Sequence, residues 1–128
     1  MIPHSLTLLE EENLICVADR ENKRILCYTA GLDGSKPGVL MFNLQHPRLG
    51  QIFAIDHIGD VLLALSIDDS TSSEIIFLDL ATERVVNSWA PAAGFKQPHD
   101  LAVSPNGRLV YVSDMSPEAT KKIIKIKM

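Results

Sequence analysis

Two stretches of this sequence share one pattern: Pro3-His4-Ser5-Leu6-Thr7-Leu8 and Pro98-His99-Asp100-Leu101-Ala102-Val103. Each is followed by an apolar run that ends in an aspartate, Asp19 in the first copy and Asp114 in the second, and then by a further apolar run. The shared unit reads P-H-x-L-x-[LV], a strand ending in x-D, and another strand. Because self-similarity at a fixed spacing is the mark of a repeat architecture, this unit decides the fold.

Short apolar runs fill most of the remaining sequence. Each lasts about four to six residues, is rich in β-branched or aromatic residues, and is bounded by turn-forming residues, which is typical of strands. Pro105-Asn106-Gly107 and Thr82-Glu83-Arg84 are predicted hairpin turns. No segment shows a long helical period, so an all-β chain is expected. The predicted strands include Leu14–Ala18, Arg24–Tyr28, Val39–Phe42, Ile52–Ile55, Val61–Leu65, Ile75–Leu78, Leu101–Val103, Leu109–Val112 and Ile123–Ile126.

A weaker third copy of the unit lies between the other two and begins at Ile52-Phe53-Ala54-Ile55. The resulting period of roughly 45 residues suits a four-stranded propeller blade. The sequence therefore predicts a partial β-propeller of about three blades, over residues 4–48, 51–90 and 99–128, with three strands in the last blade. Because a propeller needs at least about four blades to close, residues 1–128 are expected to be part of a larger propeller or to need a second copy.

The composition excludes several classes of function. The chain has 128 residues, 46% of them hydrophobic and 22% charged, so it can bury a core. A net charge of -4 and an aromatic content of 5% argue against a nucleic-acid surface. Apolar runs such as Val61–Leu65 are too short to span a membrane. The first residues, Met1–Ser5, lack the basic and apolar regions of a secretory signal.

The repeat places three chemically competent side chains on one face of the predicted propeller. His4 and His99 each open a first strand, and Arg20 lies in the loop between the second and third strands of the first blade. Both kinds of position fall on the same face near the central axis. On alternate blades of a six-bladed ring, three such histidines would form a trigonal set for one Zn²⁺ with an open fourth position.

Other candidate residues carry weaker signals. His46 and His57 match no position of the repeat and are expected to be structural or exposed. The sequence shows no serine-hydrolase triad, P-loop, dinucleotide-binding motif or EF-hand loop. Cys16 and Cys27 fall on adjacent predicted strands, where they could form a disulfide or remain two buried thiols. The residues alone leave these two alternatives open.

The pattern Val17-Ala18-Asp19-Arg20-Glu21-Asn22, between Pro3-His4-Ser5-Leu6 and Pro98-His99-Asp100, resembles the lyase domain of peptidylglycine α-amidating enzymes. That domain, peptidyl-α-hydroxyglycine α-amidating lyase, is a relative of the NHL-repeat propellers. Gln51-Ile52-Phe53-Ala54-Ile55 also resembles one of its segments. The resemblance runs along the whole chain and covers about the C-terminal half of the family's catalytic domain.

This resemblance implies a six-bladed propeller with Zn²⁺ held by three histidines. His4 and His99 match the second and third ligands, and the first belongs to a blade outside this chain. Asp100 matches a carboxylate that helps hold a structural Ca²⁺. The resemblance also implies a Cys16–Cys27 disulfide and an origin in the secretory-pathway lumen or outside the cell. Arg20 matches an active-site arginine that would position the substrate carboxylate.

The implied reaction converts a peptide ending in α-hydroxyglycine to a C-terminally amidated peptide and glyoxylate. The family's tyrosine base and a second arginine belong to the missing half, and Tyr28 and Tyr111 do not match the tyrosine. Gln97 stands where the family has methionine. The isolated chain is therefore expected to be inactive without the missing N-terminal blades. A hydroxylating monooxygenase domain is a further expected partner.

Two other functions remain open at this point. One is a non-catalytic NHL-repeat module that binds a protein partner, since the acidic charge disfavours RNA. The other is a divergent, inactive homologue of the lyase. Zinc binding that depends on His4 and His99 would favour the lyase over the binding module.

Overall fold

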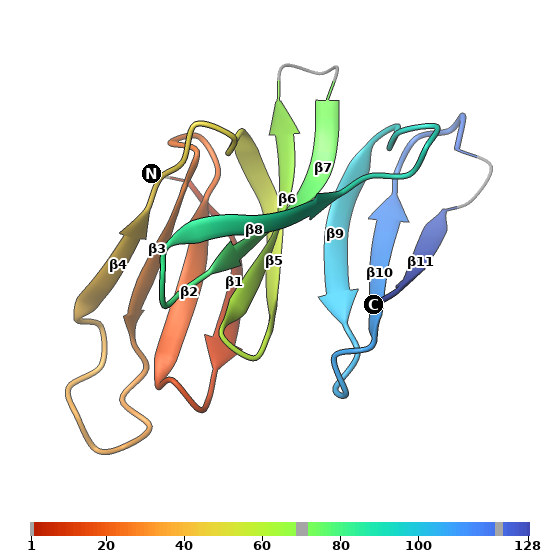
Figure 1. The fold of residues 1–128 in the computed structure, drawn as a ribbon. Coiled ribbons are helices and arrows are strands. Elements are labelled where there is room, and N and C mark those ends of the chain that lie inside the picture. The colour runs from red at the N-terminus through yellow and green to blue at the C-terminus, as the bar shows by residue number, and fades with distance from the viewer. Residues whose placement is uncertain (1, 69–71, 120–121) are drawn as a thin grey trace.

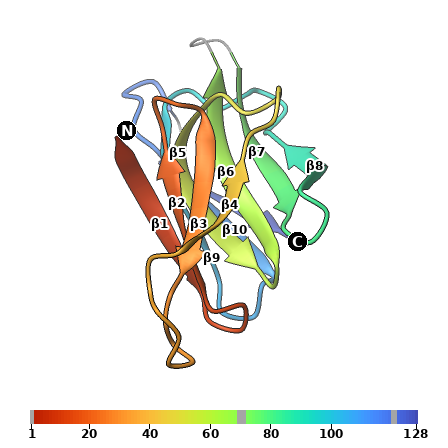
Figure 2. The ribbon, with the colours of Figure 1, turned by 90° about the vertical axis from the view of Figure 1, so that its left-hand side faces the viewer.

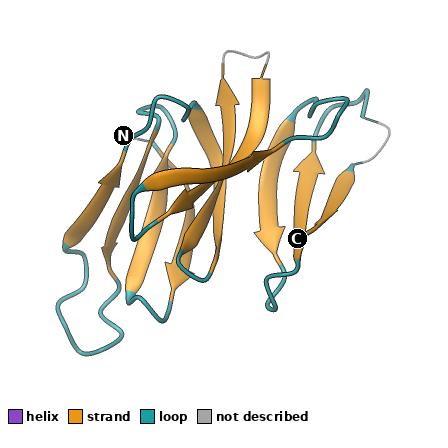
Figure 3. Ribbon diagram, viewed as in Figure 1, coloured by secondary structure: helices purple, strands orange, loops and turns teal. Residues whose placement is uncertain are grey.

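The computed structural model describes residues 2–68, 72–119 and 122–128, and within them every regular element is a β-strand (Figure 3). These residues contain no helix that could cross a membrane. The strand character follows from short runs of apolar and β-branched residues separated by turns. The strands are β1 (Pro3–Leu9), β2 (Leu14–Asp19), β3 (Arg24–Thr29), β4 (Leu40–Leu44), β5 (Gln51–Ile58), β6 (Val61–Asp68), β7 (Ser72–Asp79), β8 (Arg84–Trp89), β9 (Pro98–Val103), β10 (Leu109–Asp114) and β11 (Ile123–Lys127).

The described strands form three antiparallel sheets, each with its strands in chain order (Figure 1). The first sheet contains β1 to β4, the second β5 to β8, and the third β9 to β11. Consecutive up-and-down antiparallel strands build each sheet as a blade of a propeller. We call the sheets blade 1, blade 2 and blade 3. The all-β partial propeller predicted from the repeat is confirmed.

The first strands of the three blades lie next to one another, with β5 between β1 and β9 (Figures 1 and 2). One apolar core fills the space between blades 1 and 2, and a second fills the space between blades 2 and 3. Alternate residues of each strand supply these cores because side chains alternate between the faces of a sheet. Fully buried members include Leu9, Ile25, Leu62, Leu63, Leu65, Val110 and Val112.

The fourth strand of blade 1 departs from its predicted range. The apolar pattern predicted Val39–Phe42, whereas β4 runs from Leu40 to Leu44. Val39 instead closes a loop: its backbone N–H donates to Thr29 Oγ1 at 3.0 Å, and its carbonyl accepts from the Thr29 N–H at 2.8 Å. The loop contact therefore delays the start of the strand.

Candidate functional site

The three inner strands each carry a β-bulge at the same position of the repeat. In β1 the pairing with β2 skips His4, since Pro3 pairs with Asp19 and Ser5 with Ala18. In β5 the skipped residue is Phe53, and in β9 it is His99. A bulge leaves one residue out of the ladder and changes the direction of its side chain. The side chains of these three residues therefore do not follow the regular alternation between the two faces of the sheet. All three bulges lie at the same height in the propeller.

The side chains of the three bulged residues meet. The His4 and His99 ring centroids are 5.6 Å apart, and Phe53 lies 5.2 Å from His4 and 5.8 Å from His99. His4 is half-buried and His99 is exposed, so both rings are accessible from solvent. The repeat thus brings together two histidines that are far apart in the sequence.

One hydrogen bond fixes the tautomer of the neutral His4 ring. Its Nδ1 lies 2.6 Å from the carbonyl oxygen of Phe53. A carbonyl oxygen can only accept, so Nδ1 carries the hydrogen and donates it. In the neutral ring, Nε2 then keeps a free lone pair. A ligand histidine typically has this arrangement, with one nitrogen donating to the protein and the other available to the metal.

The spacing of the two imidazoles is compatible with one zinc ion. With Zn–N bonds of about 2.0–2.1 Å and tetrahedral angles, two ring centroids on one ion lie roughly 5 Å apart, close to the 5.6 Å between His4 and His99. Within the part of the chain that the structure describes, no group of three His, Cys, Asp or Glu side chains could hold a metal. A tetrahedral site would therefore need at least one further ligand besides these two histidines.

Arg20 lies beside this cluster in the turn between β2 and β3. Its guanidinium carbon is 5.2 Å from the Phe53 ring centroid, in the range of a cation–π contact. Its Nε also donates to Glu21 Oε1 at 2.8 Å. The arginine therefore packs on the ring of Phe53, which itself contacts both histidines, and also forms a surface ion pair with Glu21.

A buried aspartate accepts hydrogen bonds from the backbone that precedes each histidine. Asp19 Oδ1 accepts from the Ile2 N–H at 3.3 Å. Asp114 accepts from the backbone N–H groups of Lys96 at 2.9 Å and Gln97 at 3.1 Å. In blade 2 the matching position is Ser66, which accepts from the Gly50 N–H at 2.8 Å. The last residue of the x-D motif thus anchors the segment that leads into the bulge.

Hydrogen bonding sets the charge of these aspartates. Burial raises the pKa of Asp19, but hydrogen bonds from Asn22, Arg24 and the Ile2 N–H outweigh burial and lower it from its ordinary value. Burial likewise opposes ionisation of Asp114, whose pKa is nevertheless lowered by three backbone N–H donors and by the charge of Lys122. Both carboxylates are therefore ionised in the folded protein at neutral pH.

Asp100, the expected calcium ligand, is exposed beside His99. Its Oδ1 accepts from the N–H of Leu101 at 2.9 Å, a contact within its own strand. An exposed carboxylate is a suitable oxygen donor for Ca²⁺. Calcium binding stays a prediction.

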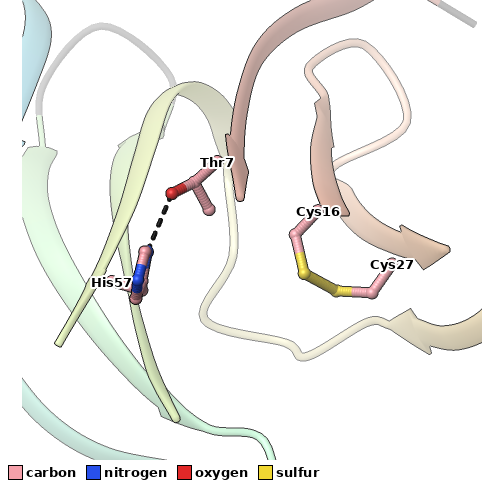
Figure 4. Close-up of a disulfide and its surroundings, with 4 residues drawn as sticks. All are labelled: Thr7, Cys16, Cys27 and His57. Carbon is pink, nitrogen blue, oxygen red and sulfur yellow. Dashed lines mark hydrogen bonds between the residues drawn. A yellow bond between two sulfur atoms is a disulfide. The ribbon is translucent and has the colours of Figure 1, made fainter. Parts of the chain in front are cut away.

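The structure joins Cys16 and Cys27 in a disulfide across β2 and β3 (Figure 4). The two residues are direct partners in the antiparallel ladder, and both are fully buried. The bond closes the hairpin that carries Arg20 at its tip. Of the two alternatives that the residues left open, the structure therefore has the disulfide that the resemblance implied.

His57 and His46 make their contacts outside the cluster of His4, Phe53 and His99. The Thr7 hydroxyl lies 2.9 Å from His57 Nδ1 and links β1 to β5 (Figure 4). His46 Nδ1 accepts from the Arg48 N–H at 3.1 Å within a loop. Both contacts are structural, in line with the expectation for two histidines outside the repeat pattern.

A cavity of about 350 Å³ opens beside His99 between blades 2 and 3. Phe53, Gln97, His99 and Met115 are among the residues that line it. Gln97, at the position where the resembled family has methionine, therefore faces the neighbourhood of the histidines. Tyr28 lies in β3 and Tyr111 in β10, outside the cluster.

Comparison with known proteins finds similarity along most of the chain. It is 38% identical over 116 residues to peptidyl-α-hydroxyglycine α-amidating lyase 2 of Drosophila melanogaster. It is 35% identical over 128 residues to peptidyl-glycine α-amidating monooxygenase B of Xenopus laevis, and 30% identical over 132 residues to a probable amidating lyase of Caenorhabditis elegans. The chain is related to the peptidyl-α-hydroxyglycine α-amidating lyases.

The matches are long in this chain but short in its relatives. They cover 89%, 94% and 100% of the chain, yet only 28%, 14% and 35% of the Drosophila, Xenopus and Caenorhabditis proteins, respectively. The NHL repeat model matches residues 1–28. Among solved structures, Kuenenia stuttgartiensis hydrazine synthase matches 98% of this chain and 32% of its own, with a TM-score of 0.70 and 14% identity. That last similarity concerns the fold alone.

Phe53 is the site residue that the sequence analysis did not single out. It occupies the histidine position of the middle repeat, as the alignment of Ile52-Phe53-Ala54-Ile55 with Pro3-His4-Ser5-Leu6 shows. In a strand, however, a phenylalanine is most simply interpreted as a core residue. The matched repeat position was the available signal.

Proposed function

We propose that this chain is part of a zinc-dependent peptidylamidoglycolate lyase. The observation that carries the proposal is the convergence of His4 and His99, with 5.6 Å between their ring centroids and with the His4 Nδ1–H held by a backbone carbonyl. The similarity to amidating lyases supplies the reaction class. A third histidine and a tyrosine base would come from blades outside residues 1–128.

The proposed substrate is a peptide that ends in α-hydroxyglycine. The bond between the amide nitrogen and the hydroxylated carbon breaks, the hydroxyl group loses its proton, and the nitrogen gains one. The products are the peptide amide and glyoxylate. A zinc ion held by His4, His99 and a further ligand would supply Lewis acidity to this reaction.

The chain's own residues would bind and orient the reactants. His4 and His99 would present neutral ring nitrogens to the metal, and the Phe53 carbonyl would fix the His4 tautomer. Arg20, 26% exposed, would direct its guanidinium toward the substrate carboxylate. The Glu21 ion pair and the Phe53 ring restrict the guanidinium before substrate binds.

Zinc binding tests the ligand assignment. We expect the purified chain to bind Zn²⁺ in competition with a chromophoric chelator, and His4→Ala and His99→Ala each to lose most of that affinity. His46→Ala is the matched control, since the contact of His46 is with Arg48 in its own loop rather than with His4, Phe53 or His99, and it should bind as the original chain does. Equal affinity in all four proteins would overturn the assignment.

Lyase activity is assayed separately as glyoxylate release from an α-hydroxyglycine peptide. We expect release close to background from residues 1–128 alone, and turnover from a longer protein that also contains the complementary blades. Robust turnover by the 128-residue monomer would show that the ligand count is wrong. Specific zinc binding without turnover in the longer protein would favour an inactive homologue.

The NHL match is shared by the lyase and by one alternative, a propeller module that binds a protein partner. This function requires no metal, so a chain that folds and binds no zinc would support it.

A structural Ca²⁺ at Asp100 and a secretory or extracellular location complete the proposal. The Cys16–Cys27 disulfide supports the location because such bonds persist in oxidising compartments. A Ca²⁺-dependent rise in the thermal midpoint that Asp100→Asn abolishes would support the calcium site; an equal rise in the variant would contradict it.

A further inference from the structure

Blade 2 breaks the pattern of metal-ligand candidates along the three inner strands. The bulged residue is histidine in blades 1 and 3 and phenylalanine in blade 2, at one position of the repeat. The bulge at Phe53 is therefore retained where no ligand is present. A bulge disrupts the ladder locally, so its presence here calls for a role of the residue that it redirects.

The Phe53 ring contacts all three candidate site side chains. Its centroid is 5.2 Å from that of His4, 5.8 Å from that of His99, and 5.2 Å from the Arg20 guanidinium carbon. Both histidine rings meet it in edge-to-face geometry, with interplanar angles of 62° and 78°. Such contacts restrict rotation of an imidazole about its side-chain bonds. The backbone of the same residue accepts the hydrogen of His4 Nδ1.

We propose that Phe53 is the positioning residue of the metal site, with its ring as the surface against which both His4 and His99 pack and its carbonyl as the group that fixes the His4 tautomer. The inference rests on the proposed metal-binding function. Phe53 itself donates no atom to a metal. It sets the distance and orientation of the two imidazoles before a metal arrives, and so reduces the entropy lost on binding.

The alternative is that Phe53 only fills the core between blades 2 and 3, where it packs against buried residues. If Phe53 were only a core residue, replacing it would lower the stability of the fold. Zinc affinity would then fall only as far as that loss of stability explains. Phe42 is the matched control: it is also half-buried and also packs against a core cluster, but it lies in β4 on the outer side of blade 1.

The test compares Phe53→Leu, Phe53→Tyr and Phe42→Leu with the original chain. We expect Phe53→Leu to lose about 10- to 100-fold in Zn²⁺ affinity, the range found when groups supporting a ligand are removed. Phe53→Tyr, which keeps the ring, should stay within a few-fold, and Phe42→Leu should bind normally. The visible spectrum of bound Co²⁺ should change in Phe53→Leu alone. Equal zinc losses in the two leucine variants, or no loss in either, would overturn the proposal.

A metal-free measurement separates this inference from the proposed function. Ring ¹⁵N chemical shifts of the histidines report tautomer and orientation in the protein without metal. We expect the His4 and His99 signals to change in Phe53→Leu and to stay as in the original chain in Phe42→Leu. If the chain binds no zinc but these signals change, the metal function fails and the positioning role stands. If Phe53→Leu leaves both histidine signals unchanged, the positioning role is wrong whether or not zinc binds.

Discussion

Single buried carboxylates hold the backbone that leads to each histidine. Asp114 is 4% exposed and accepts from the N–H groups of Lys96, Gln97 and Ser116. It therefore fixes a segment that would otherwise be an unpaired loop before His99. A carboxylate suits this position because both of its oxygens accept and neither carries a hydrogen that would need an acceptor.

Asp114→Asn is expected to destabilise the fold by about 1–3 kcal/mol, since one acceptor oxygen becomes an amide donor that faces N–H groups. The pKa of Asp114 is lowered in the folded state. The ionised carboxylate therefore contributes its full stabilisation of the fold above the ordinary aspartate pKa of 3.8, and this stabilisation is lost as the pH falls below that value. The difference in urea midpoint between the original chain and the variant should therefore be largest at neutral pH and shrink in acid.

The control for this carboxylate is Asp60→Asn, in the exposed turn between β5 and β6. It should leave the urea midpoint nearly unchanged at both pH values. A difference between Asp114→Asn and the original chain that is independent of pH would contradict the role of the ionised group.

The Cys16–Cys27 bond constrains one hairpin, the β2–β3 pair that carries Arg20 at its turn. The bond spans a sequence separation of 11, so it limits the unfolded chain locally. Replacing both cysteines by alanine should lower the free energy of unfolding by about 2–4 kcal/mol. The measurement is urea unfolding with and without reductant. The double variant should unfold at the same midpoint in both conditions, while the original chain should lose stability on reduction.

Gly50, directly before β5, allows close contact between two backbone segments. A Cβ at this position would lie 2.5 Å from the Ile67 carbonyl oxygen and 2.9 Å from its carbonyl carbon. Gly50→Ala should therefore displace the start of β5 and cost about 1–3 kcal/mol of stability.

Ser66→Ala provides the comparison for Gly50→Ala. It removes the acceptor of the Gly50 N–H without adding volume, so the larger loss should belong to Gly50→Ala. Thermal unfolding of both variants measures the difference. A Gly50→Ala variant as stable as the original chain would show that β5 shifts without cost.

The strands could be predicted from the sequence because their apolar runs are short and well separated by turns. The pairing of His4 with His99 was also predictable, since both stand at one position of a repeat. The three bulges were not, because a bulge depends on the register between two strands rather than on local composition. The role of Phe53 follows from its bulge, so it was hidden for the same reason.

One side chain in the middle blade connects all three blades. Asp56 Oδ1 accepts from Thr7 Oγ1 of blade 1 at 3.3 Å, and its Oδ2 accepts from the Val103 N–H of blade 3 at 2.8 Å. Apolar packing between blades is non-directional. These two hydrogen bonds fix how far the inner strands are shifted along the propeller axis relative to one another. The distance between His4 and His99 depends on that shift.

Asp56→Asn should therefore weaken the coupling between blades more than the structure within any blade. We expect a loss of about 1–3 kcal/mol in overall stability and faster hydrogen exchange at the amide of Val103, whose acceptor is altered. Asp79→Asn is the control, because among the residues that the structure describes the Asp79 carboxylate accepts only from Thr82, within one hairpin of blade 2. It should speed exchange at Thr82 and leave Val103 protected. Unchanged exchange at Val103 in Asp56→Asn would mean that apolar packing alone sets the height of blade 3 against blade 2, and with it the distance between His4 and His99.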